Sequence, residues 1–243
     1  MVRYGGTPRR ASLMNAHLTN AGREALQEQY AAHEAAYERI DARIRAVKGA
    51  YTAADEDTRL TALKRAYAYA VLTANSPLAA ADRSYGRWLA GDGPREVCYD
   101  ERHTNQKGDW FASGLENFTE KARPVDRKIL AEEYGEAAEI AAENLTGISR
   151  VKARFMVGLL TGETACIDTH AERFVRSHVT GGDKLADAKN AASPEKYETA
   201  TAALSAGIPA VSRFVAQWVS FDAARDTFTP HDNFYNSLPF TVA

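Results

Sequence analysis

Residues 145–175 read LTGISRVKARFMVGLLTGETACIDTHAERFV. Gly147 can adopt the left-handed backbone of a tight turn, and Ser149 is a residue type that caps helices. The stretch therefore predicts two helices joined by a glycine-centred turn. The N-terminus of the second helix would present backbone N–H groups and a partial positive charge, which suit a phosphate oxygen. An ordinary helix–helix turn with a basic rim explains the same residues equally well.

Asp168 follows an apolar run, Ala-Cys-Ile, and stands where another helix is predicted to begin. One interpretation is structural: Asp168 caps that helix, with Thr169 and Glu172 forming a capping box. The other is functional. A partly desolvated carboxylate at a cleft can act as a general base or stabilise a developing positive charge.

The composition of the chain limits the classes of function. Its 243 residues, 45% apolar and 26% charged, are typical of a globular protein with a full core. The net charge of −2 provides no overall basic field, so any nucleic acid must bind a local patch. Two cysteines, Cys98 and Cys166, are too few for a four-thiolate cluster. Without a signal-peptide core or an 18-residue apolar run, we expect a reduced, cytoplasmic protein that does not enter membranes.

Abundant alanine and apolar spacings of three and four predict an all-α fold. A long N-terminal helix is expected over about 20–48, with an apolar heptad seam from Leu26 to Val47. This seam indicates either a coiled-coil dimer or packing on the protein's own core, and we favour the core because three heptads are few. We expect two parts: a lead-in and long helix over 1–50, and a helical domain over 51–243. Within the second part, the hairpin spans 145–162 and the loop with the aspartate spans 163–170.

Two further segments interrupt the helical pattern. Asn75-Ser76-Pro77 predicts a break, with Ser76 as the N-cap of a helix that begins at Pro77 and ends at Leu89. Residues 91–114 are polar and irregular and predict a long loop. Loops of that length inside a compact domain are often functional, although a surface excursion is the simpler explanation.

The order of these features resembles the helix-hairpin-helix DNA glycosylase superfamily. The hairpin of that family reads roughly L-P-G-[V/I]-G-x-x-x-A, and its catalytic aspartate follows about twenty residues later in V-D-T-H. Here Gly147 and Asp168 are twenty-one positions apart, Ala153 matches the last hairpin residue, and Thr169-His170 complete the second motif. Residues 67–77, YAYAVLTANSP, look like the family's DNA-facing L-L-S-x-Q-T turn. The likeness covers about residues 60–180.

This resemblance implies a two-lobed, all-α body with a cleft that accepts a base extruded from double-stranded DNA. Asp168 would stabilise the oxocarbenium-like transition state of N-glycosidic base excision, and Lys152 is the second candidate catalytic residue. The expected DNA-binding residues are Asn75, Ser76, Gly147, Ile148, Ser149, Arg150, Lys152, His170 and Arg173. No cofactor or metal is expected, and the hairpin is a candidate site for a monovalent cation.

Several residues depart from the family pattern. Ser149 replaces the second hairpin glycine. Val151 stands where members that cleave the DNA backbone carry a nucleophilic lysine, and Lys152 is turned about 100° further around the helix. The sequence therefore argues against Schiff-base strand cleavage. The long N-terminal helix and the 91–114 segment have no counterpart in the family.

These departures leave other functions open. The chain is also similar to a bacteriophage branch of thymine-hypermodifying enzymes, the glutamyl and putrescinyl thymidine pyrophosphorylase group, which joins an amine or amino acid to an activated 5-(phosphomethyl)uracil. Asp168 would then be a general base for the amine, Lys152 or Arg173 would aid departure of the phosphate group, and the 91–114 segment, with His103, Lys107 and Trp110, would form an extra pocket. A non-catalytic DNA-binding module is a third interpretation. A helical interaction protein that associates through the 26–47 seam is the fourth.

Overall fold

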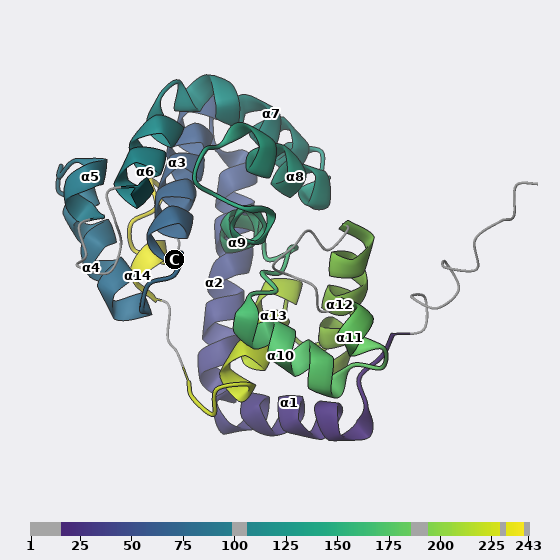
Figure 1. Cartoon of the computed structure of the whole chain (residues 1–243). Helices are drawn as coiled ribbons and strands as arrows, with labels where there is room; N and C mark the ends of the chain where they lie inside the picture. The colour runs from purple at the N-terminus through teal and green to yellow at the C-terminus, as the bar shows by residue number, and fades with distance from the viewer. Residues whose placement is uncertain (1–15, 99–105, 186–193, 229–231, 241–243) are drawn as a thin grey trace, which may run out of the picture. The chain divides into compact units, whose positions relative to one another are not determined.

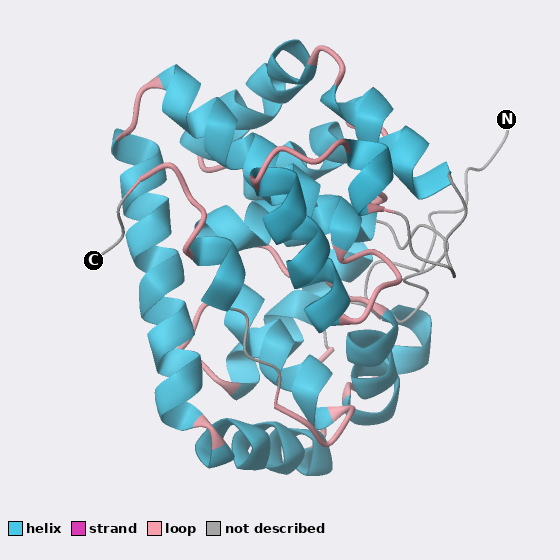
Figure 2. Cartoon of the chain, turned by 90° about the vertical axis from the view of Figure 1, so that its left-hand side faces the viewer, coloured by secondary structure: helices cyan, strands magenta, loops and turns pink. Residues whose placement is uncertain are grey.

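The computed structural model describes residues 16–98, 106–185, 194–228 and 232–240, and these ranges are mainly helical (Figure 2). No β-strand occurs in them, and a single isolated antiparallel bridge joins Leu18 to Val179. The predicted all-α fold is confirmed. Within the same ranges, no helix is long and apolar enough to cross a membrane.

The elements can be followed along the chain in Figure 1. In order, they are α1 (Asn20–Ala32), α2 (Glu34–Ala53), α3 (Glu56–Leu72), α4 (Leu78–Leu89), α5 (Pro94–Val97), α6 (Gln106–Leu115), α7 (Phe118–Leu130), α8 (Tyr134–Asn144), α9 (Arg150–Thr161), α10 (Thr169–His178), α11 (Gly182–Leu185), α12 (Pro194–Gly207), α13 (Arg213–Ala223) and α14 (Asp232–Tyr235).

The chain divides into two compact units, each built from segments that are distant in sequence. Unit 1 comprises Met1–Tyr37 and Ile167–Thr229, and unit 2 comprises Glu38–Cys166 and Pro230–Ala243. In unit 1, α10 packs against α1, α11 and α13, and α12 packs against α13. In unit 2, α8 packs between α7 and α9, and α3 contacts α4, α6, α7 and α9. This division differs from the expected boundary at residue 50, because the chain passes from one unit to the other inside α2.

The single long helix predicted over 20–48 is wrong, because the chain forms two helices that meet at His33. The backbone of His33 (φ −136°, ψ 25°) departs from the helical region and ends α1. The seam residues with the lowest exposure are Leu26, Tyr37, Ile40, Ile44 and Val47, all at 2% or less. The seam therefore lies in the protein's own interior, as we favoured. A coiled-coil dimer through it would need residues that are already buried.

The predicted loop over 91–114 is also wrong in part, because its described residues include α5 and α6. Gly108 lets the two helices approach closely: a Cβ atom there would lie 2.8 Å from the Cα atom of Arg95. Phe111, one turn of α6 further on, is fully buried. Tertiary packing thus stabilises a helix in a segment whose sequence is polar and rich in glycine. His103 lies outside the described residues.

The break at residues 73–77 occurs where it was predicted, but its capping differs. Pro77 is the N-cap residue of α4, which begins at Leu78, so Ser76 is not the N-cap. The other end of α4, at Leu89, matches the prediction.

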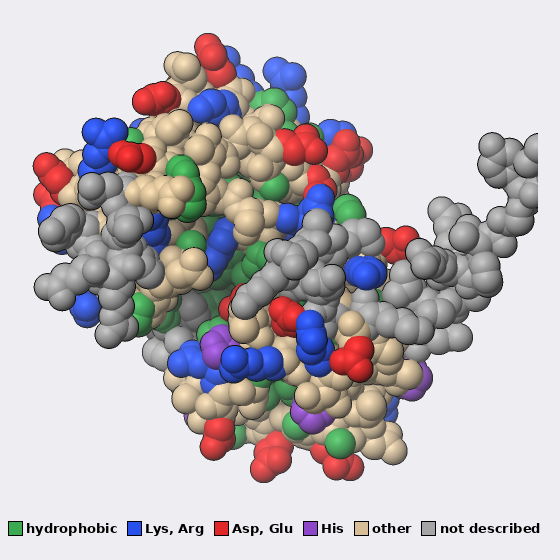
Figure 3. Space-filling view, viewed as in Figure 1, with side chains coloured by type: hydrophobic (Ala, Val, Ile, Leu, Met, Phe, Trp, Pro, Cys, Tyr) green, Lys and Arg blue, Asp and Glu red, His purple; other side chains and the backbone are tan. Residues whose placement is uncertain are grey.

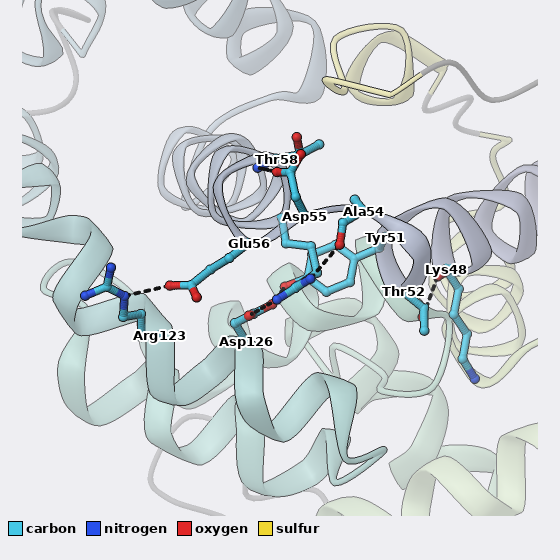
Figure 4. A network of polar contacts seen from close by, with 10 residues as sticks. Lys48, Tyr51, Thr52, Ala54, Asp55, Glu56, Thr58, Arg123 and Asp126 are labelled. Carbon is cyan, nitrogen blue, oxygen red and sulfur yellow. Dashed lines mark hydrogen bonds and ion pairs between the residues drawn. The ribbon is translucent and has the colours of Figure 1, made fainter.

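A buried polar cluster ties three helices of unit 2 together (Figure 4). The hydroxyl of Tyr51 on α2 donates to Oδ1 of Asp126 on α7 at 2.6 Å. Arg59 on α3 binds both oxygens of the same carboxylate, at 2.9 and 3.0 Å. Burial raises the pKa of Tyr51 far above its ordinary value, so its hydroxyl remains a donor. Nearby, Glu56 pairs with Arg123, which adds a second link between α3 and α7.

Candidate nucleic-acid interface and carboxylate site

The helices α8 and α9 form the predicted hairpin, and both belong to unit 2. Gly147 adopts φ +90°, which an L-residue rarely does, so this position requires glycine. The flanking Leu145 and Ile148 are buried, whereas Thr146 and Ser149 are exposed. Ser149 is the N-cap residue of α9, but its side chain makes no capping hydrogen bond. The hairpin turn therefore anchors itself with apolar residues and presents polar ones at the surface.

Positive charge gathers at the start of α9. Glu139 on α8 pairs with both Arg150 and Arg154, and the latter is only 1% exposed. Lys152 forms no ion pair with any described residue; its Nζ atom donates to Oγ1 of Thr73 at 3.2 Å. Arg150 and Arg154 thus share the Glu139 carboxylate, and Lys152 adds a further positive charge to the first turn of α9. A positive excess at a helix N-terminus favours an anionic ligand such as phosphate.

The turn after α3 is held by a lysine from α6. Nζ of Lys107 donates to the carbonyl oxygens of Leu72 and Ala74, at 2.8 and 2.9 Å, and to Oγ of Ser76 at 3.0 Å. A cation there also offsets the partial negative charge at the C-terminus of α3. Asn75, in the middle of the turn, adopts φ +55° and is exposed. Lys107 thus fixes the backbone of the turn and leaves the Asn75 side chain at the surface.

Two hydrogen bonds connect this turn and its helix to the hairpin. The Lys152–Thr73 bond joins the start of α9 to the end of α3. The buried Tyr67 donates from its hydroxyl to the carbonyl oxygen of Thr146 at 2.6 Å. The structure therefore brings together, within unit 2, the hairpin and the Asn75 turn that the sequence marked as separate DNA-binding candidates.

Asp168 belongs to unit 1, where it caps α10. Its Oδ1 atom accepts hydrogen bonds from the backbone N–H groups of His170 and Ala171, both at 3.0 Å. The structural interpretation, that Asp168 is an N-cap, is confirmed, but the predicted capping box is wrong because the Glu172 carboxylate binds Arg176 instead. The other oxygen, Oδ2, accepts no hydrogen bond from the described residues. The cap thus orients a half-buried carboxylate and leaves one oxygen available.

His170 lies beside this carboxylate with an altered protonation equilibrium. Burial lowers its pKa below the ordinary 6.5, Asp168 opposes the change, and Arg225 and Arg173 reinforce it. Its ring packs edge-on against Phe221 with 5.2 Å between centroids. Its Nδ1 atom is buried and has no hydrogen-bond partner among the described residues. At neutral pH the imidazole is therefore mainly uncharged.

Two exposed arginines flank His170, and neither forms an ion pair with a described residue. They are Arg173 on α10 and Arg225 just after α13. The guanidinium of Arg225 lies 5.0 Å from the centre of the Phe221 ring, a cation–π contact that orients it. In Figure 3, Lys and Arg side chains adjoin a histidine on the visible face of unit 1. Arg173 and Arg225 together supply the positive charge that a phosphate or another anion requires.

Arg225 and Phe221 were not predicted from the sequence. They follow Asp168 by more than fifty residues, and no motif surrounds them. Their only local signal is an aromatic residue and an arginine four positions apart at the end of a helix, which is common on protein surfaces. The packing of α13 against α10 places them beside His170.

The predicted site residues thus fall into two groups. Asn75, Ser76, Gly147, Ile148, Ser149, Arg150 and Lys152 lie in unit 2, whereas Asp168, His170 and Arg173 lie in unit 1. Each group is brought together within its own unit. Comparisons of this chain with protein-family models, with curated proteins and with solved structures found no match.

Proposed function

We propose that this protein is an enzyme that excises a base from DNA by cleaving the N-glycosidic bond, without cleaving the strand. The observation that carries the proposal is the geometry of Asp168. One carboxylate oxygen is fixed by two backbone N–H groups, and the other accepts no hydrogen bond from the described residues. An oriented, half-buried carboxylate with one available oxygen suits stabilisation of positive charge in a transition state.

In this mechanism the bond between C1′ and the base nitrogen breaks, and its electron pair leaves with the base. Positive charge develops on the sugar, where Oδ2 of Asp168 stabilises it. Water then bonds to C1′, the proton it loses passes to the Asp168 carboxylate as general base, and the departed base anion takes up a proton from the solvent. The uncharged His170 adds no repulsion to the developing cation. Arg173 and Arg225 would hold a neighbouring phosphate.

The hairpin supports the binding half of the proposal. Arg150, Lys152 and the N-terminus of α9 supply the positive charge that a phosphate requires, and Gly147 keeps the turn narrow. Val151, where a nucleophilic lysine would stand, offers no amine for a Schiff base. The hydrogen bond from Nζ of Lys152 to Thr73 holds this lysine at the start of α9. We therefore assign Lys152 to phosphate binding rather than to catalysis.

Mass spectrometry of nucleosides tests the proposed reaction. The protein is incubated with DNA that contains normal, damaged or 5-substituted pyrimidines, and we expect a released free base and an abasic site. Asp168→Asn should abolish turnover while DNA affinity stays within a few fold. Asparagine is the matched substitution because it caps helices as well as aspartate does but carries no charge. Full activity of this variant would refute the mechanism.

The same measurement separates the other interpretations. A heavier nucleoside, formed only when an amine or amino acid is supplied, would replace base excision with hypermodification. Tight DNA binding without any change in the nucleosides would indicate a non-catalytic DNA-binding module. The absence of DNA binding would refute all three and leave an interaction protein.

A further inference from the structure

One face of α6 packs against the hairpin turn. A Cβ atom on Gly114 would lie 2.7 Å from the carbonyl oxygen of Thr146, and a Cβ atom on Gly147 would lie 3.0 Å from the Cβ atom of Trp110. Residues 110 and 114 are one helical turn apart, so they share a face of α6. The helix therefore supports the turn at two successive positions, both through glycines that permit close approach.

The helix itself is firmly held, yet the Trp110 side chain remains at the surface. Phe111 is fully buried and packs near the rings of Tyr67 and Trp88, with 6.0 and 5.7 Å between centroids. Trp110 is 45% exposed, whereas Trp218 is 4% exposed. Tryptophan is highly buried on average, so a large exposed indole on a fixed helix is a candidate contact residue.

We propose that Trp110 extends the hairpin into a nucleic-acid-binding surface, where its indole stacks on a base of a DNA strand whose phosphate lies at the start of α9. This inference rests on the proposed DNA-directed function. It also assigns a role to a segment that has no counterpart in the family that the sequence resembles. The base would be an unpaired or extruded one, because a base within a duplex already stacks on its neighbours.

The surroundings of Trp110 favour a nucleic acid over an apolar protein partner. The exposed residues of the hairpin turn and of the first turn of α6 are polar: they are Gln106, Asp109, Thr146 and Ser149. A single aromatic side chain in polar surroundings does not form the contiguous apolar patch of a protein interface. An aromatic platform next to cations that contact phosphate is the common arrangement in proteins that bind single strands.

Tryptophan fluorescence tests this inference directly. Wild-type protein is titrated with a duplex that contains one unpaired base, and with fully paired duplex of otherwise identical sequence. We expect quenching in the wild type that is absent in Trp110→Phe, which retains Trp88 and Trp218. Trp110→Ala should weaken binding of the unpaired-base duplex about tenfold, as expected for one stacked base. Leu130→Ala removes another exposed apolar side chain of unit 2, which is 39% exposed, and should bind normally.

The outcomes separate the inference from the proposed function. If the wild type binds DNA but neither the Trp110 emission nor the affinity of Trp110→Ala differs from the reference, the inference fails and DNA binding stands. An equal loss in Leu130→Ala would also overturn the inference. If Trp110 responds to DNA but no base is released, the inference stands and the enzymatic proposal fails. If no DNA binds, both fail.

Discussion

The hydroxyl of Tyr67 donates a hydrogen bond to the backbone carbonyl of Thr146 at 2.6 Å, and this bond fixes the hairpin turn to α3. Gly114 makes room for it, since a Cβ atom there would lie 1.7 Å from the Tyr67 hydroxyl oxygen. Burial raises the pKa of Tyr67, so the phenol stays protonated and donates throughout the accessible pH range. The hairpin turn thus depends on a side chain that lies 79 residues before Thr146 in the chain.

Removing this hydroxyl should loosen the hairpin. Tyr67→Phe is expected to lower the free energy of unfolding by about 1 kcal/mol, the usual net value of one hydrogen bond. Urea denaturation measures the loss, and hydrogen exchange should accelerate at the amides of residues 146–149. The amides of α13 in unit 1 serve as an internal reference. Unchanged exchange at the turn would show that the bond does not hold it.

Gly147 offers a test of the backbone conformation of the turn. Gly147→Ala should cost about 1–2 kcal/mol, because alanine is strained at φ +90° and its Cβ atom would press on Trp110. The matched control is Gly49→Ala, a position inside α2 where a Cβ atom meets nothing within 4 Å. That control should gain about 0.5–1 kcal/mol from helix propensity. Equal effects in urea denaturation would contradict the assigned turn geometry.

Lys152 allows a quantitative test of phosphate contact. Lys152→Ala should weaken DNA binding and reduce the slope of log K against log salt by up to about one unit, as expected when one phosphate contact is lost. The control is Lys64→Ala, which removes an exposed lysine of α3 and should leave the slope unchanged. Affinities are measured by fluorescence anisotropy between low and moderate salt. The same slope in both variants and the wild type would remove Lys152 from the interface.

The two roles of Asp168 can be separated by two substitutions. Asp168→Ala loses the cap of α10 and should cost about 1 kcal/mol of unfolding free energy. Asp168→Asn keeps the cap and should lower the free energy of unfolding by only a few tenths of a kcal/mol. If both variants lose activity but only the alanine variant loses stability, the carboxylate charge acts in the reaction rather than in folding. Thermal denaturation and the nucleoside assay together provide these readouts.

His170 should make the stability of the protein depend on pH. Its pKa is lowered in the folded state, so below pH 6.5 the unfolded chain binds a proton more readily than the folded one. Its contribution to stability is therefore complete above pH 6.5 and declines as the pH falls toward the folded-state pKa. His170→Gln lacks this contribution, and its Tm should fall less than that of the wild type between pH 7 and 5.5. Parallel curves would contradict the assignment.

Features with local causes were predicted from the sequence alone. α9 lies within the expected hairpin of 145–162, α10 begins directly after Asp168 as predicted, and Gly147 forms the turn between α8 and α9. Apolar periodicity, caps and glycine conformation depend on neighbours within a few residues, so they can be read from the chain. For the same reason the sequence indicates two roles for Asp168, a helix cap and a catalytic carboxylate. The sequence could not choose between these roles, and the structure shows that the cap leaves Oδ2 available.

Features with tertiary causes were missed or misplaced. The polar segment over 91–114 folds in part into α6 because Phe111 is buried and Gly108 and Gly114 permit close contacts, which no local pattern reveals. The helix break at His33 was missed as well, since the heptad seam continues across it.

The sequence by itself therefore determined the class of fold, the glycine turn of the hairpin and the position of Asp168 at the start of α10. Only the tertiary structure decided which side chains surround them. Lys107 reaches the turn after α3, and Arg225 and Phe221 reach His170, because helix packing brings distant positions within a few ångströms. Local propensity specifies where helices begin and end, but side-chain neighbours across the chain depend on how those helices bury their apolar faces.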